Sequence, residues 1–108
     1  MTITVNPVNF NVSKDLIERI EAIFGEVDKY NDQLVGLDIY LKSLTETDTG
    51  EKMVEVKIFL PGKNLFVAEK ADDFVSAAQQ SFDVVKRVVR KEKEKVKDRH
   101  EPRPDKIA

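Results

Sequence analysis

Residues 54–62 read Val-Glu-Val-Lys-Ile-Phe-Leu-Pro-Gly, and this stretch decides the fold. Aliphatic side chains occupy every second position up to Leu60, which is the period of a strand with one buried face. The Pro-Gly pair that follows predicts a turn, so residues 65–70 should return as an antiparallel strand. The same alternation over residues 34–44 predicts the strand before it, joined by a polar loop at 45–51.

Segments with helical periodicity lie on both sides of these strands. Apolar residues recur at three- and four-residue steps over 14–29, after the N-cap candidate Ser13. Gly25 weakens this predicted helix by up to about 1 kcal/mol relative to alanine. A short alternating strand at 2–5 precedes it, and we expect Asn6-Pro7 to end that strand because proline cannot donate to a ladder.

A second helix is predicted over residues 74–97, with Asp72 or Asp73 as its N-cap. Its apolar stripe ends at Val89, but the residues that follow are good or acceptable helix formers. The helix should therefore run beyond the body of the domain.

The resulting order, β-α-β-β-β-α, predicts an α/β protein of the α+β two-layer sandwich type. Each strand has one apolar face and each helix has one apolar stripe, so a four-stranded sheet should carry both helices on one face. We expect a single domain at residues 1–97 and a flexible C-terminal tail at 98–108, which contains Pro102 and Pro104.

Composition excludes several classes of protein. The 108 residues include no cysteine, which excludes a disulfide framework, a thiolate metal site and a cysteine nucleophile. The single histidine, His100, falls in the predicted tail without a pocket or fixed partner, so we expect no catalytic centre, cofactor, metal or small-molecule substrate. No secretory signal or membrane span is recognisable, which makes a cytoplasmic location the expectation.

The formal net charge of −2 hides a division within the chain. Residues 1–83 hold 8 basic and 15 acidic side chains, whereas residues 84–108 hold 10 basic and 5 acidic ones. An acidic body thus precedes a basic helix end. The net charge of the whole chain, taken alone, argues against binding to nucleic acid. The basic helix end nevertheless permits such binding.

Helical geometry arranges these bases in two rows. The first row lies within about 60° around the helix axis, and it contains Lys86, Arg90, Lys93 and Lys97. The second lies beside it and contains Arg87, Lys91 and Lys95. Such a ridge suits a phosphate backbone, because cations release condensed counterions from RNA or DNA. A solvated helix end, partly neutralised by Glu92 and Glu94, is the alternative interpretation.

The open face of the predicted sheet carries the aromatic residues Tyr40, Phe59 and Phe66. Aromatic side chains on an open sheet can stack RNA bases. No basic residue accompanies Phe66, however, and aromatics on strands more often form cross-strand pairs. We therefore expect a structural role for them.

Several short patterns occur in a recognisable order and together resemble the ribosome hibernation factors, also labelled sigma-54 modulation proteins or ribosome-associated inhibitors. The resemblance covers about Thr2 to Lys97. Its patterns are Val12-Ser13-x-x-Leu16, Asp28-Lys29-Tyr30, Leu60-Pro61-Gly62, Asp73-Phe74, Ala77-Ala78 and Asp83-x-x-x-Arg87-x-x-Arg90-Lys91-x-Lys93-Glu94-Lys95.

The resemblance implies a double-stranded-RNA-binding-like fold and a non-enzymatic function. The protein would bind the small ribosomal subunit, with its 16S-type ribosomal RNA, in the decoding channel. It would exclude messenger and transfer RNA there and silence translation under stress or in stationary phase. The positions that match the family's bases, and so would contact RNA phosphates, are Lys29, Arg87, Arg90, Lys91, Lys93 and Lys95. Lys86 and Lys97 join them from the first row.

The chain also departs from its apparent relatives. Val84 and Val75 stand where the family usually has lysine and tyrosine. Bases typical of the family's first helix are replaced here by Ile17, Ala22, Ile23 and Glu26. By the resemblance, we expect the chain to correspond to a short form, without the extra C-terminal domain that long members use to pair ribosomes. An acidic first helix suits a basic protein partner better than RNA, so a protein-interaction module that regulates a transcription factor is the alternative function.

Overall fold

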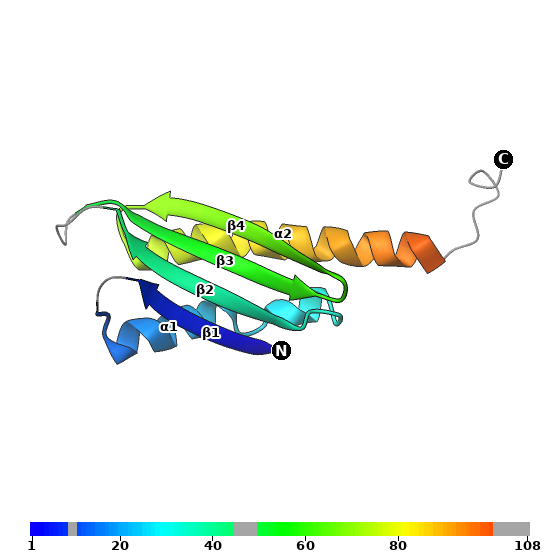
Figure 1. Cartoon of the computed structure of the whole chain (residues 1–108), viewed down its shortest axis with the longest axis horizontal. Coiled ribbons are helices and arrows are strands. Elements are labelled where there is room, and N and C mark those ends of the chain that lie inside the picture. The colour runs from blue at the N-terminus through cyan, green and yellow to red at the C-terminus, as the bar shows by residue number, and fades with distance from the viewer. Residues whose placement is uncertain (9–10, 45–49, 101–108) are drawn as a thin grey trace.

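The computed structural model describes residues 1–8, 11–44 and 50–100, and for residues 95–100 it describes the backbone alone. Its elements follow the predicted order (Figure 1). They are β1 (Thr2–Val8), α1 (Lys14–Phe24), the 3-10 helix η1 (Val27–Tyr30), β2 (Gly36–Ser43), β3 (Lys52–Leu60), β4 (Lys63–Ala71) and α2 (Phe74–His100).

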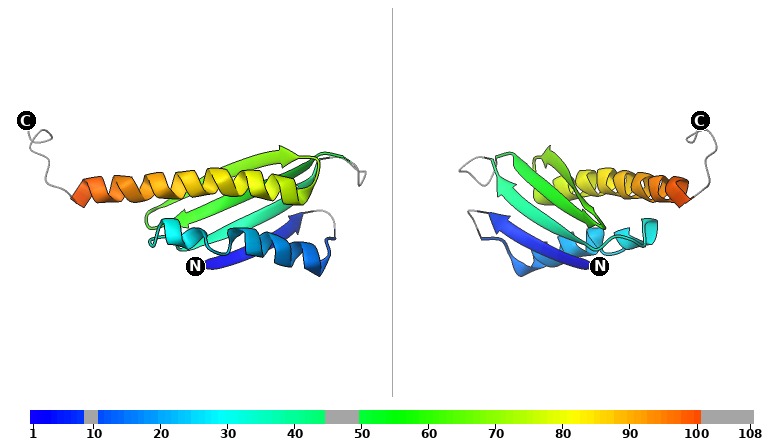
Figure 2. Two further views of the ribbon diagram at one scale, coloured as in Figure 1. Left: turned by 180° about the vertical axis from the view of Figure 1, so that it is seen from behind. Right: turned by 45° about the vertical axis from the view of Figure 1, so that its right-hand side comes forward.

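The strands form one sheet in the order β1-β2-β3-β4. β1 runs parallel to β2, and the other two pairs are antiparallel. Both helices cover the same face of this sheet (Figure 2), so the predicted two-layer architecture is confirmed.

The core lies between the sheet and the helices. Alternate residues of β3 are buried along its length, as the sequence period predicts, and Val54, Val56 and Ile58 are fully buried. The helices contribute Phe24 and Val85 to the same cluster. Burial of these apolar side chains on one face of the sheet is the main driving force for this fold.

β1 is longer than the sequence predicts, because the strand continues through Pro7 to Val8. Pro7 lies opposite Leu41 in the register with β2. β1 is an edge strand, and proline is tolerated there because its missing N–H need not serve a second neighbour.

The first helix is shorter than predicted. Ser13 caps it as expected, with its side-chain oxygen accepting a hydrogen bond from the Leu16 N–H at 3.1 Å. The α-helix ends at Phe24 with Gly25 as its C-cap, and the chain re-forms as the separate 3-10 helix η1. The helix therefore stops at the position where the sequence predicted only a loss of helix stability.

α2 begins at a cap and extends further than predicted. The Asp73 carboxylate accepts the Ser76 backbone N–H at 2.7 Å and the Ser76 hydroxyl at 3.0 Å. These two bonds, the backbone bond first, lower the pKa of Asp73. The helix continues to His100, three residues past the predicted end, so His100 is helical rather than part of a tail. The remaining tail, 101–108, and residues 45–49 of the predicted polar loop lie outside the described residues.

Close approach of β1 and β2 makes one glycine sensitive to substitution. A Cβ on Gly36 would lie 2.7 Å from the Thr2 carbonyl oxygen, which is too short without a shift of the strand backbone. We expect Gly36→Ala to lower the free energy of unfolding by about 1–3 kcal/mol, as overpacking does elsewhere. Urea denaturation followed by circular dichroism measures this. The neighbouring Val35→Ala, at a 58% exposed position, should change little, and equal effects of the two would refute the steric explanation.

Candidate nucleic-acid interface

The basic side chains of α2 lie on two flanks of the helix. Lys86 and Arg90 face η1, and Lys93 follows them one turn later on the same side. We call these three residues the η1-facing row. Arg87 and Lys91 are exposed on the other flank. The side chains of Lys95 and Lys97, which the sequence analysis also assigned to RNA, lie outside the described residues.

Tyr30 brings three of the predicted site residues together. Its ring centroid lies 5.5 Å from the Lys29 Nζ, 5.7 Å from the Lys86 Nζ and 6.0 Å from the Arg90 guanidinium carbon. We call Lys29, Tyr30, Lys86 and Arg90 the Tyr30 cluster. Attraction between each cation and the negative ring face offsets part of the repulsion among the three charges. The cluster therefore holds three cations close together, and this geometry suits an anion of high charge.

Packing beneath the cluster explains why η1 and α2 meet here. Phe24, at the end of α1, contacts Phe82 of α2 edge to face, with ring centroids 5.8 Å apart. The 3-10 helix η1 begins three residues after Phe24. Lys29 and Tyr30 therefore lie beside the next turn of α2. Lys86 also lies over the Phe82 ring at 5.9 Å, which joins the cluster to this aromatic pair.

Among the described residues, the acid Glu26 contacts the cluster. Glu26 accepts a hydrogen bond from the Lys29 ammonium at 2.9 Å. This bond and the accompanying charge attraction raise the pKa of Lys29 and lower the pKa of Glu26. Exposed ion pairs of this type contribute little and are screened by salt, so a phosphate can displace Glu26 from Lys29.

Glu92 does not belong to the ridge, contrary to the sequence analysis, which counted it among the acids that partly neutralise the bases. Its side chain is only 10% exposed and pairs with the Lys63 Nζ at 2.9 Å on the sheet side of the helix. The exposed acid in the described basic segment 86–94 is Glu94. The ridge is consequently more positive than its sequence composition indicates.

The neighbouring helix α1 has the opposite charge. Asp15, Glu18 and Glu21 are exposed along it, opposed by Lys14 and Arg19. Lys14 pairs with Glu18 at 3.8 Å. Among the described side chains, bases thus gather on α2 with Lys29 of η1 beside them, whereas acids outnumber bases on the exposed surface of α1.

The open face of the sheet differs in one respect from what the sequence predicts. Lys57 of β3 lies over two aromatic rings, 5.2 Å from the Phe59 centroid and 5.9 Å from that of Phe66. A basic residue therefore does accompany Phe66, because the antiparallel register places the two side chains directly opposite each other. Lys42 pairs with Glu55 on the same face, which leaves the charges there mixed.

Two residues of the interface were not singled out from the sequence as site residues. Tyr30 was part of the Asp28-Lys29-Tyr30 pattern, but from the sequence only the bases were expected to contact RNA. Asn31 is 1% exposed, and its amide donates a hydrogen bond to the Val89 carbonyl oxygen at 2.9 Å. No local pattern signals a contact across 58 residues of chain.

The described residues offer neither of two other kinds of site. No group of three or more histidine, cysteine, aspartate or glutamate side chains there could hold a metal ion. None of the helices in those ranges combines the length and the hydropathy needed to cross a membrane.

Comparison with known proteins identifies a family and two solved structures of similar fold. Residues 3–97 match the family described as sigma 54 modulation protein / S30EA ribosomal protein. No curated protein matches the chain significantly.

Two solved structures share the architecture. The crystal structure of the Thermus thermophilus Protein Y N-terminal domain superposes with a TM-score of 0.71 at 20% identity, and the match covers 84% of this chain and 98% of that one. A ribosomal subunit interface protein from Coxiella burnetii gives a TM-score of 0.61 at 18% identity, covering 91% and 99%. At these identities the likeness shows the fold.

Proposed function

The chain belongs to the sigma 54 modulation protein / S30EA ribosomal protein family, and from this premise we propose that it is a ribosome hibernation factor. In this proposal it binds the decoding channel of the small ribosomal subunit, through the surface that η1 and α2 form. The solved ribosomal subunit interface protein of the same fold is consistent with a ribosomal partner.

The observation that carries the proposal is the Tyr30 cluster continued by Lys93. Three cations from two separate elements converge within 6.0 Å of one ring centroid, and the row then follows the helix. Cations fixed in this way can each contact a phosphate of folded RNA, and Arg90 can bind one with two parallel hydrogen bonds. A solvated helix end would not need a lysine from η1 on the same ring.

The proposed mechanism is occupancy of a site. The bound protein fills the channel that messenger and transfer RNA require, so translation stops under stress or in stationary phase with no bond made or broken. This function places the protein in the cytoplasm with its ribosomes. Because α1 is acidic, RNA contacts are concentrated on η1 and α2.

Co-sedimentation with purified small subunits at increasing salt tests the proposal. With at least four phosphate contacts, the logarithm of the affinity should fall against the logarithm of salt concentration with a slope of about −3 or steeper. Messenger and transfer RNA added together should displace the protein. Binding that is insensitive to salt, or that persists beside both RNAs, would contradict the proposed site.

The exposed acids of α1 favour a second candidate, a module that binds a basic protein such as a transcription factor. A pull-down from lysate with and without nuclease separates the two. Recovery that is lost with nuclease supports the ribosome. Recovery of one protein that survives nuclease supports the interaction module.

A further inference from the structure

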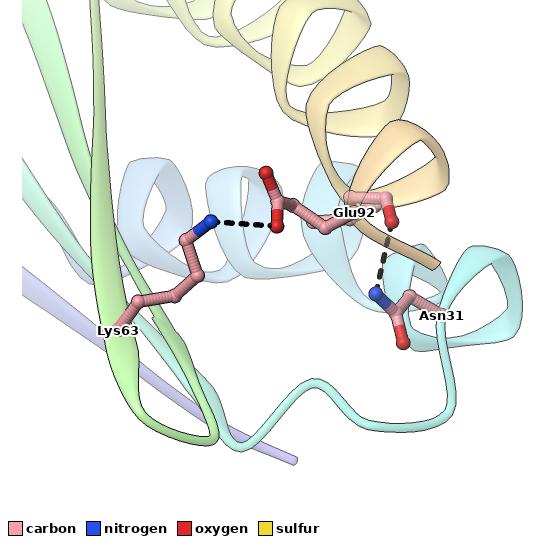
Figure 3. A network of polar contacts seen from close by, with 4 residues as sticks. Asn31, Lys63 and Glu92 are labelled. Carbon is pink, nitrogen blue, oxygen red and sulfur yellow. Dashed lines mark hydrogen bonds and ion pairs between the residues drawn. The ribbon is translucent and has the colours of Figure 1, made fainter. Parts of the chain in front are cut away.

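Two polar contacts fasten α2 at the place where it leaves the body of the domain (Figure 3). One joins Asn31 to the Val89 carbonyl, and the other joins Lys63 to Glu92, so the two lie one helical turn apart on α2. Among the side chains of α2 that the structure describes, which end at Glu94, Val89 and Glu92 are the last buried ones, and Lys93 and Glu94 are exposed. Figure 1 shows the remaining turns running past the sheet.

Asn31 uses both ends of its amide. The nitrogen donates to the Val89 oxygen at 2.9 Å, while the oxygen accepts the Gln33 backbone N–H at 2.9 Å. Since the side chain is 1% exposed, these bonds are protected from competing water. They fix the end of η1, and with it Lys29 and Tyr30, against α2.

Lys63 reaches the same stretch of α2 from the sheet. It is the first residue of β4, directly after Gly62, whose φ of 79° suits a residue without a side chain. Its ammonium meets the Glu92 carboxylate at 2.9 Å, and the Glu92 side chain is 10% exposed while that of Lys63 is 37% exposed. The carboxylate of this pair is shielded from water, which strengthens its charge-assisted hydrogen bond with the partly exposed ammonium.

Two contacts thus reach α2 from different elements, close to the point where its buried apolar stripe ends. Figure 3 shows Lys63 approaching from β4 and Asn31 from the segment after η1. We propose that Asn31, Lys63 and Glu92, which we call the α2 anchor, are positioning residues that aim the η1-facing row at its RNA partner. The inference rests on the proposed function and adds residues that would act on RNA binding without touching RNA.

Glu92 and Glu94 provide a matched pair for the test, because simple electrostatics and the α2 anchor predict opposite signs for Glu92. Removing either acid deletes one negative charge from the basic end of the chain. Glu94→Ala should tighten binding to purified small ribosomal subunits about threefold, since an exposed acid repels RNA. Glu92→Ala makes the same change in charge but releases the anchor, and we expect about fivefold weaker binding.

Two further variants distinguish an effect on the orientation of α2 from an effect on the stability of the folded protein. The charge exchange Lys63→Glu with Glu92→Lys restores the pair at unchanged net charge and should recover most of the affinity. Val85→Ala opens a cavity in the core without touching the anchor, so the folded protein should bind normally after correction for the unfolded fraction. If Val85→Ala weakens folded-state binding as much as Glu92→Ala does, the anchor has no special role.

Asn31 is tested through the residue that it positions. In an Asn31→Ala background, the additional change Lys29→Ala should cause less than half of the loss that it causes in the parent protein, because the two act through one contact. Fully additive losses would remove Asn31 from the anchor.

Amide hydrogen exchange of the free protein tests the anchor without the ribosome. Glu92→Ala should speed exchange at residues 90–94 at least about tenfold relative to Glu94→Ala. Equal affinities of the two variants, or equal exchange, overturn the inference while leaving the proposed function intact. Failure of the parent protein to bind small subunits overturns the proposed function, and the exchange comparison still decides whether the anchor holds α2.

Discussion

Replacing Lys29, Lys86, Arg90 and Lys93 together with alanine should reduce affinity for the small ribosomal subunit about a thousandfold at moderate salt. Each cation that neutralises a phosphate steepens the salt dependence by about 0.7–0.9, so four lost contacts correspond to roughly this factor near 0.1 M. Sedimentation of the purified variant with small subunits across a salt series measures both the affinity and the slope. The slope should become shallower by about 3.

A control with the same loss of charge is available on other surfaces. Lys14, Arg19, Lys42 and Lys70 likewise comprise three lysines and one arginine, and they lie on α1 and on the sheet. Lys14 takes part in an exposed ion pair, of a type that contributes little to stability, and Lys42 takes part in a half-buried pair with Glu55. Replacing all four with alanine should retain most of the affinity. Equal losses in the two variants would mean that net charge alone, rather than the η1–α2 surface, governs binding.

Phe24→Ala should lower the free energy of unfolding by about 3–5 kcal/mol, a large effect for a single substitution. Phe24 is fully buried, and its ring meets Phe82 at an interplanar angle of 82°. Its removal leaves a cavity between α1 and α2, below the Tyr30 cluster. Domains of this size have only about 5–15 kcal/mol of stability, so the variant should lose a large share of its free energy of unfolding. Urea titration followed by circular dichroism measures the change.

The same substitution at Phe66 is the matched comparison. Phe66 is 64% exposed and contacts the Lys57 ammonium across the open face of the sheet. Its loss should cost less than about 1 kcal/mol, because little apolar area returns to water. Ribosome binding should be unchanged in Phe66→Ala, since the proposed interface lies on the opposite side. A loss of binding there would point to RNA contacts on the sheet.

Local sequence patterns were sufficient for the element order. Alternation from Val54 to Leu60 and the Pro61-Gly62 turn predicted the hairpin, and the helical steps predicted both helices. The bounds failed where the outcome depends on neighbours. Pro7 stays in a strand because β1 lies at an edge, and no period within residues 2–8 reveals which strand is at the edge.

The candidate site was predicted in part. The bases of α2 were proposed from their spacing on one helix. That Lys29 lies close to them could not be predicted in this way, because Lys29 and the bases of α2 are more than 50 residues apart in the sequence. Glu92 was misassigned for a related reason. Helical spacing shows which residues share a side, yet only the sheet beneath α2 reveals that Glu92 faces Lys63.

Protection of individual lysines on the ribosome tests the central assignment most directly. The protein can be treated with an amine-modifying reagent, alone and bound to small subunits, and the modified residues identified by mass spectrometry. Binding through the η1–α2 surface predicts strong protection of Lys29, Lys86 and Lys93, while Lys42 and Lys70 of the sheet react as in the free protein. Protection of the sheet lysines with full reactivity of Lys29 and Lys86 would contradict it.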